Sequence, residues 1–196
     1  DALSCGPIRR FMIPDTLGIL NPDNTYAFCS EMIRRYPDVR FDFHAHNDYD
    51  LAVANVMAAV KAGVHGIHTT INGLGERAGN APLSSVIAVL NDQIKTPNGV
   101  VERRINHVSR VVETYTGVHI PANKPVVGEN VFTQCAGIHA DGDNKDNLYY
   151  NDLLPERFGR VREYALGKMS GKANIRKNLD ALGIDLDEES MRKVTE

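Results

Sequence analysis

Short apolar runs and helix-like periodic segments take turns along the first half of the chain. The apolar runs read as strands over residues 9–13, 39–44 and 66–71. The segments between and after them have helical spacing and read as helices over residues 21–35, 50–62 and 82–91. Asn21 before Pro22 is a typical helix start, and Gly63 is a typical helix stop. Strands that alternate with helices in this way predict β/α units around a parallel sheet.

Three strands are too few to form a complete α/β domain. They cannot close a barrel, and a parallel sheet of three strands would leave both of its edges unpaired. Either a barrel or an open sheet is compatible with such units, because crossovers between parallel strands are right-handed in both. We therefore expect further strands on the N-terminal side, and we interpret this part of the chain as the second half of a barrel.

The pattern changes near Lys95. Residues 102–116 read as a helix whose apolar stripe holds Ile105, Val108, Val111 and Val112. Further on, residues 174–182 read as a helix, and Asp187 is placed to cap another one.

Composition narrows the class of protein. The chain has 196 residues, 42% hydrophobic and 24% charged, which is typical of a globular domain. A net charge of −3 argues against nucleic acid as a partner. No apolar run approaches the roughly 20 residues that span a bilayer, and the first residues lack the basic and apolar pattern of a signal peptide, so we expect none there. The three cysteines are widely spaced, so we expect no disulfide framework and a reducing, cytoplasmic location.

The run from Phe41 to Asp48 carries the strongest chemical signal. Side chains on a strand alternate between its two faces, so Asp42, His44 and His46 share one face. Two imidazoles two residues apart at the carboxyl end of a strand can hold a single divalent cation. A pair of hydrogen-bonded histidines without a metal is the alternative.

Five motifs follow one another along the chain: Asp15–Gly18, His44–Asp48, Gly73–Ala81, Gly137–Gly142 and Leu166–Lys172. In this order they resemble the family of 2-isopropylmalate, homocitrate and citramalate synthases. A lone H-x-H is a weak signal, whereas the long glycine-rich loop is specific and the ordered set is strong.

The resemblance implies the C-terminal part of a TIM barrel followed by a small mixed α/β linker subdomain. The last three β/α units of the barrel would occupy residues 1–94, a first linker subdomain 95–142, and a partial second one 143–196. It further implies an acyltransferase that condenses acetyl-CoA with a 2-oxo acid, most similar to 2-isopropylmalate synthase, in a homodimer whose linker subdomain covers the partner's barrel.

The resemblance also assigns roles to single residues. His44, His46 and Asn80 would bind a divalent cation, which could be Mn, Mg, Zn or Co, and Thr16 would contact the carboxylate of the 2-oxo acid. His139 and Tyr150 would be the catalytic pair that forms the enolate. Each of these residues also has a simpler structural interpretation. Asn80 could be a turn residue, Thr16 a cap, His139 a buried histidine and Tyr150 a packing residue. The family's fourth ligand, an Asp within an Arg-Asp-Gly motif, is absent from this sequence.

Several alternatives stay open on the sequence. A homocitrate, citramalate or Re-citrate synthase would share these motifs, and so would a non-catalytic fragment. A carbon–carbon lyase of the HMG-CoA lyase type usually lacks the G-L-G-E-R loop, and an amidohydrolase carries H-x-H on its first barrel strand. The family's His-Glu-Ser is replaced here by residues 134–136 (Gln-Cys-Ala), and Asp50 replaces a usual Gly, which leaves the substrate open.

Overall fold

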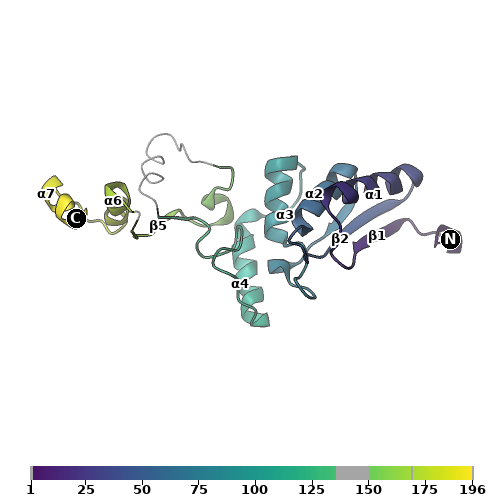
Figure 1. Cartoon of the computed structure of the whole chain (residues 1–196), viewed down its shortest axis with the longest axis horizontal. Helices are drawn as coiled ribbons and strands as arrows, with labels where there is room; N and C mark the ends of the chain where they lie inside the picture. The colour runs from purple at the N-terminus through teal and green to yellow at the C-terminus, as the bar shows by residue number, and fades with distance from the viewer. Residues whose placement is uncertain (1, 136–150, 169, 196) are drawn as a thin grey trace. The chain divides into compact units, whose positions relative to one another are not determined.

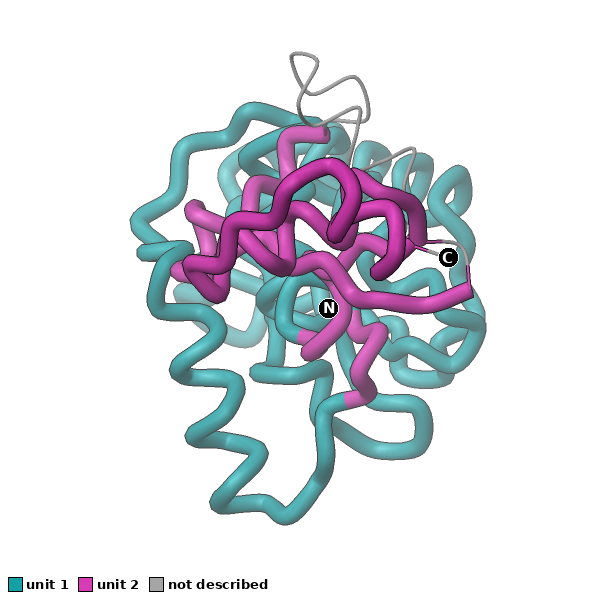
Figure 2. The backbone as a smooth tube through the Cα atoms, turned by 90° about the vertical axis from the view of Figure 1, so that its left-hand side faces the viewer, with its two compact units in different colours: residues 1–120, 125–127 teal, residues 121–124, 128–196 magenta. Residues whose placement is uncertain are grey.

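The computed structural model describes residues 2–135, 151–168 and 170–195. The chain folds as two compact units (Figure 2). The first holds residues 1–120 and 125–127, and the second holds residues 121–124 and 128–196.

A three-stranded parallel sheet forms the centre of the first unit. Its strands are β1 (Arg10–Asp15), β2 (Arg40–Ala45) and β3 (Gly66–His68), in the order β1-β2-β3. The parallel β/α arrangement that the sequence predicts is confirmed. However, β3 is shorter than predicted, because Thr70 pairs instead with Pro82 and the backbone turns at Asn72, whose φ is 59°. The 3-10 turns η1 (Ala2–Cys5) and η2 (Ile71–Gly73) flank the sheet region in the chain.

Helices α1 (Pro22–Arg35) and α2 (Ala52–Ala62) lie side by side along the sheet (Figure 1). The predicted start of α1 is confirmed, since the Asn21 side chain accepts a hydrogen bond from the Asn24 amide at 2.9 Å. The predicted stop of α2 is confirmed by Gly63, which adopts φ 99°.

The buried core of the first unit lies on one face of β2. Phe41, Phe43 and Ala45 are at most 2% exposed, and Cys29 of α1 and Val56 of α2 are buried as well. Because strand side chains alternate, this leaves the opposite face of β2 to polar residues. Helix α3 (Leu83–Val89) follows the glycine-rich loop and continues into the π-helical turn η3 (Leu90–Ile94).

Helix α4 (Ile105–Thr116) follows the 3-10 turn η4 (Glu102–Arg104). Its predicted stripe is only partly right. Ile105 is buried, but Val108 and Val111 are more than a third exposed, whereas Ser109 is buried and its carbonyl accepts a hydrogen bond from Asn72.

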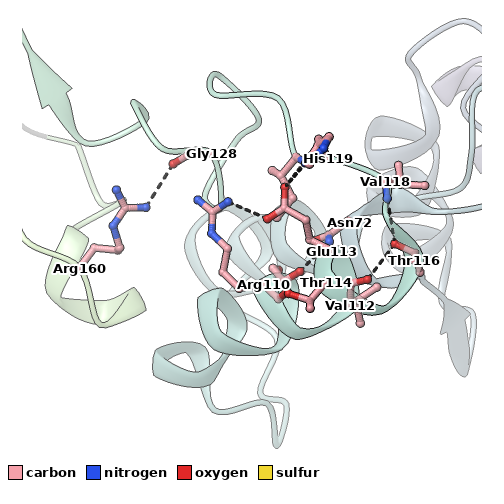
Figure 3. Close-up of polar contacts among 12 residues, drawn as sticks. Asn72, Arg110, Val112, Glu113, Thr114, Thr116, Val118, His119, Gly128 and Arg160 are labelled. Carbon is pink, nitrogen blue, oxygen red and sulfur yellow. Dashed lines mark hydrogen bonds and ion pairs between the residues drawn. The ribbon is translucent and has the colours of Figure 1, made fainter.

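The chain that leaves α4 is held back against the helix by Glu113 (Figure 3). The Glu113 carboxylate accepts hydrogen bonds from the Ile120 amide at 2.7 Å and from Arg110 at 2.9 Å. These contacts, the amide first, lower the pKa of Glu113. The carboxylate therefore fixes the segment from the end of α4 to Ile120.

In the second unit, the short strands β4 (Thr133–Gln134) and β5 (Glu163–Tyr164) pair in parallel. The 3-10 turn η5 (Pro155–Phe158) precedes β5, and helices α6 (Lys172–Ala181) and α7 (Glu188–Thr195) follow it. The predicted cap of α7 is confirmed, because the Asp187 carboxylate accepts a hydrogen bond from the Ser190 amide. No helix among the described residues is long and apolar enough to cross a membrane.

Candidate metal and substrate site

The polar residues singled out in the first unit gather where its three strands end. Asp15 and Ala45 are paired in the register of β1 and β2, so Thr16 and His46 follow at the same edge of the sheet. His46 in turn forms a backbone bridge with Asn80 of the glycine-rich loop. The carboxyl ends of parallel strands are where α/β proteins carry their ligand sites.

The two imidazoles of the H-x-H motif lie next to each other. The ring centroids of His44 and His46 are 5.1 Å apart, with the planes at 71°. The Nδ1 atom of each ring is buried and has no hydrogen-bond partner among the described residues. Burial, followed by the neighbouring His46 and His68, lowers the pKa of His44, which favours the neutral, ligand-competent imidazole.

Asn80 lies at the same edge of the sheet. Its side-chain NH₂ donates to the Leu74 carbonyl at 3.3 Å, whereas its Oδ1 atom is buried and has no partner among the described residues. Its backbone amide donates to the Gly73 carbonyl at 3.0 Å. A Cβ atom on Gly75 would lie 2.5 Å from the Asn80 Nδ2, so the Asn80 side chain would have to shift if any other residue stood there.

These groups fit a divalent cation. Two imidazoles on one cation, with bonds of about 2.1 Å, bring their ring centroids to roughly 5 Å from each other. The separation of 5.1 Å between His44 and His46 agrees with this geometry. The Asn80 Oδ1 atom, which has no hydrogen-bond partner among the described residues, adds a third atom that can bind the cation. Two imidazoles and one amide oxygen are fewer ligands than a metal site usually has. Among the described residues, no group of three His, Cys, Asp or Glu side chains that could hold a metal ion occurs.

Asp42 shares the strand face of His44, as predicted, but its carboxylate is engaged elsewhere. It receives two hydrogen bonds from Arg10, at 2.6 and 2.8 Å, and these lower the pKa of Asp42. His68 lies 3.8 Å from the same carboxylate. Asp42 therefore forms an ion pair between β2 and Arg10 of β1, and its carboxylate is already occupied by that contact.

Thr16 follows β1 in a loop that Asp15 fixes. The buried Asp15 carboxylate accepts the backbone N–H groups of Ile19 and Leu20, both at 3.1 Å. The carbonyl oxygen of Thr16 accepts a hydrogen bond from Arg77 at 2.9 Å. Thr16 therefore lies at the edge of the sheet that His46 also occupies.

Arg77 is the site residue that the sequence interpretation missed. Its guanidinium also binds the Asp48 carboxylate in a bidentate manner, at 2.7 and 3.0 Å, and this lowers the pKa of Asp48. The only signal in the sequence was the Arg of the G-L-G-E-R run. His139 and Tyr150, the predicted catalytic pair, lie outside the described residues.

Comparison with known proteins identifies the family. Residues 2–112 match the HMGL-like family, and residues 126–196 match the homocitrate synthase post-HMGL domain-like family. A putative (R)-citramalate synthase of Methanopyrus kandleri is 42% identical over 95% of this chain and 37% of its own length. The homocitrate synthase of Sulfolobus acidocaldarius is 41% identical over 94% of this chain and 39% of its own length. A probable 2-isopropylmalate synthase of Methanopyrus kandleri is 40% identical over 94% and 37%, respectively.

The chain thus spans less than two fifths of the length of these relatives. Among solved structures, the HMG-CoA lyase of Bacillus subtilis aligns with a TM-score of 0.55 at 23% identity, over 61% of this chain and 42% of the lyase. The lyase of Pseudomonas aeruginosa aligns with a TM-score of 0.54 at 21% identity, over 61% and 41%. These likenesses show the fold, in which the three β/α units form part of a TIM barrel. The chain belongs to the HMGL-like family.

Proposed function

We propose that this chain forms part of the active site of an acyltransferase that condenses acetyl-CoA with a 2-oxo acid. The observation that supports the proposal is that His44, His46 and Asn80 lie at one edge of the sheet, each with a buried polar side-chain atom that has no partner among the described residues. Buried polar atoms normally have a hydrogen-bond partner. Imidazole nitrogens and an amide oxygen that lack one are atoms of the kind that bind metals, and they support a cation there.

The residues have distinct parts in this proposal. His44, His46 and Asn80 hold a divalent cation (Mn, Mg, Zn or Co), which when bound supplies a Lewis acid for the ketone of the 2-oxo acid. Thr16 donates its hydroxyl to the carboxylate of that substrate, which fixes the orientation of the keto carbon. His139 and Tyr150 move the proton that leaves the methyl group of acetyl-CoA.

The substrate is proposed at the level of its class. Relatives named for citramalate, homocitrate and 2-isopropylmalate synthesis are 40–42% identical to this chain. We propose 2-oxoisovalerate, the substrate of a 2-isopropylmalate synthase of leucine biosynthesis, as the first acid to test, with 2-oxoglutarate, pyruvate and oxaloacetate as the alternatives. A homodimer whose linker subdomain covers the partner's barrel belongs to the same proposal, as does a cytoplasmic location, which the three free cysteines support.

Release of CoA tests the function. Full-length protein that contains this chain is incubated with acetyl-CoA, a divalent cation and one 2-oxo acid at a time, and free thiol is measured. We expect thiol release that depends on both the cation and one of the acids, and that is lost in the His44→Gln/His46→Gln variant. Absence of release with all four acids and all four cations would contradict the proposal.

A further inference from the structure

Arg77 connects all three loops that follow the strands of the first unit. It lies in the loop after β3 that also carries Asn80. Its Nε and Nη2 atoms bind the two carboxylate oxygens of Asp48, in the loop after β2, at 2.7 and 3.0 Å. Its Nη2 atom also donates to the carbonyl of Thr16, after β1, at 2.9 Å. One side chain thus joins segments that are 29 and 61 residues apart in sequence.

The surrounding backbone is shaped around this contact. Arg77 itself has φ 54°, a left-handed conformation that residues with a Cβ atom seldom adopt. Gly18 has φ 63°, and a Cβ atom there would overlap the Asp48 carboxylate. Strained backbone is retained where the surrounding contacts over-determine it. The strained backbone of Arg77 and the close approach of Asp48 to Gly18 therefore indicate that the Arg77–Asp48 pair fixes the loops, and that it is more than a chance surface pair.

The same loops carry the candidate ligands. The Asn47 amide, next to His46, donates to the Gly79 carbonyl, next to Asn80, at 2.9 Å. The Gly79 amide donates to the Glu76 carbonyl at 2.8 Å, which closes the turn that contains Arg77. Holding Arg77 against Asp48 therefore holds the Asn80 loop against the His46 loop.

We propose that Arg77 is a positioning residue that sets the distance between the Asn80 oxygen and the two imidazoles, and ties both to the Thr16 loop. The inference rests on the proposed function. An ordinary surface ion pair would not have this role, because exposed pairs contribute little to stability and nothing to the geometry of a distant ligand. A planar, forked donor is needed, so lysine is a poor replacement.

The test compares Arg77→Gln and Arg77→Lys with Arg34→Gln in the full-length protein. Arg34 is a matched control, because it makes the same two-point contact with Glu31, at 2.9 and 2.8 Å, but within the single helix α1. The first readout, taken without metal, is hydrogen exchange at the amides of Asn47 and Asn80. The second is the dissociation constant for Mn²⁺.

We expect exchange at both amides to become about tenfold faster in Arg77→Gln. The Mn²⁺ dissociation constant should rise about 10- to 100-fold, as it does when groups that orient ligands are removed. Arg77→Lys should recover little of either effect, and Arg77→Gln/Asp48→Asn should be no worse than Arg77→Gln alone. Arg34→Gln should match the wild type.

The outcomes separate the two proposals. If the wild type binds no Mn²⁺, the metal proposal fails, and hydrogen exchange alone decides whether Arg77 holds the loops. If the wild type binds Mn²⁺ and Arg77→Gln equals Arg34→Gln in both readouts, the positioning role is overturned while the proposed function stands. Full recovery by Arg77→Lys would also overturn it.

Discussion

Replacement of Gly79 by alanine perturbs the candidate metal loop at a single atom. Gly79 has φ 86°, and a Cβ atom there would overlap the carbonyl oxygen of Gly73. That oxygen accepts the backbone N–H of Asn80 at 3.0 Å. The added methyl group must therefore displace the carbonyl that holds the Asn80 backbone in place.

The magnitude follows from two contributions. A left-handed backbone costs a residue with a Cβ atom about 1–2 kcal/mol. Loss of the hydrogen bond to the buried Asn80 costs about 1–3 kcal/mol more. We therefore expect Gly79→Ala to lower the free energy of unfolding by about 3 kcal/mol, measured by urea denaturation. Displacement of Asn80 should also weaken Mn²⁺ binding, measured by calorimetry, about 10- to 100-fold.

Gly117 provides a matched control. It also has positive φ, at 69°, but a Cβ atom there would meet no heavy atom within 4 Å. Gly117→Ala should therefore cost only the backbone contribution of about 1–2 kcal/mol and leave Mn²⁺ binding unchanged. If the two variants were equally stable and bound Mn²⁺ equally well, the contact between residues 79 and 73 would have no role in holding Asn80, and the reasoning would be refuted.

Three further predictions concern the packing and titration of the chain. Phe43 is fully buried, so Phe43→Ala should lower the free energy of unfolding by about 3–5 kcal/mol in urea denaturation, and a loss below 1 kcal/mol would contradict the assigned core. Burial raises the pKa of the Cys29 thiol to about 11, so a disulfide reagent at pH 8 should modify the exposed Cys5 and Cys135 quickly and Cys29 only on unfolding; three fast thiols would refute this. The pKa of Glu113 is lowered in the folded state, so its contribution to stability is present above its unfolded value of 4.5 and is lost as the pH falls through the folded value. Glu113→Gln should therefore be less stable than the wild type at pH 7 and equal to it at pH 2, and a difference that persisted at pH 2 would count against the assignment.

Local signals explain which parts of the fold could be predicted. The starts of α1 and α7 depend on capping side chains within three residues of the amides that they bind, at Asn21 and Asp187, and both were found as predicted. The end of β3 depends instead on the bridge between Thr70 and Pro82, and an apolar run cannot reveal such a pairing. The buried face of a helix likewise depends on tertiary contacts. The sequence therefore predicted Val108 in the buried stripe of α4, whereas the structure buries Ser109.

The residues of the candidate site also divide into those that a local pattern predicts and those whose contacts depend on the tertiary fold. His44 and His46 share a strand face by simple alternation, and the loop motif indicated Asn80 by resemblance. The Arg77 contacts cross 29 and 61 residues of sequence, so they follow from the tertiary fold and from no local pattern. Asp42 could be assigned to the histidine face, but its capture by Arg10 depends on the register of β1 against β2.

One cation shared by two imidazoles and the Asn80 amide is the centre of the proposed active site. Pulsed electron paramagnetic resonance of bound Mn²⁺ tests this most directly, because it detects the nitrogen nuclei of coordinating histidines. We predict one Mn²⁺ per chain with couplings from two imidazole nitrogens, of which one is lost in His44→Gln and one in His46→Gln, while His68→Gln retains both. Bound Mn²⁺ that showed no histidine coupling, or the same couplings in all three variants, would contradict the shared site.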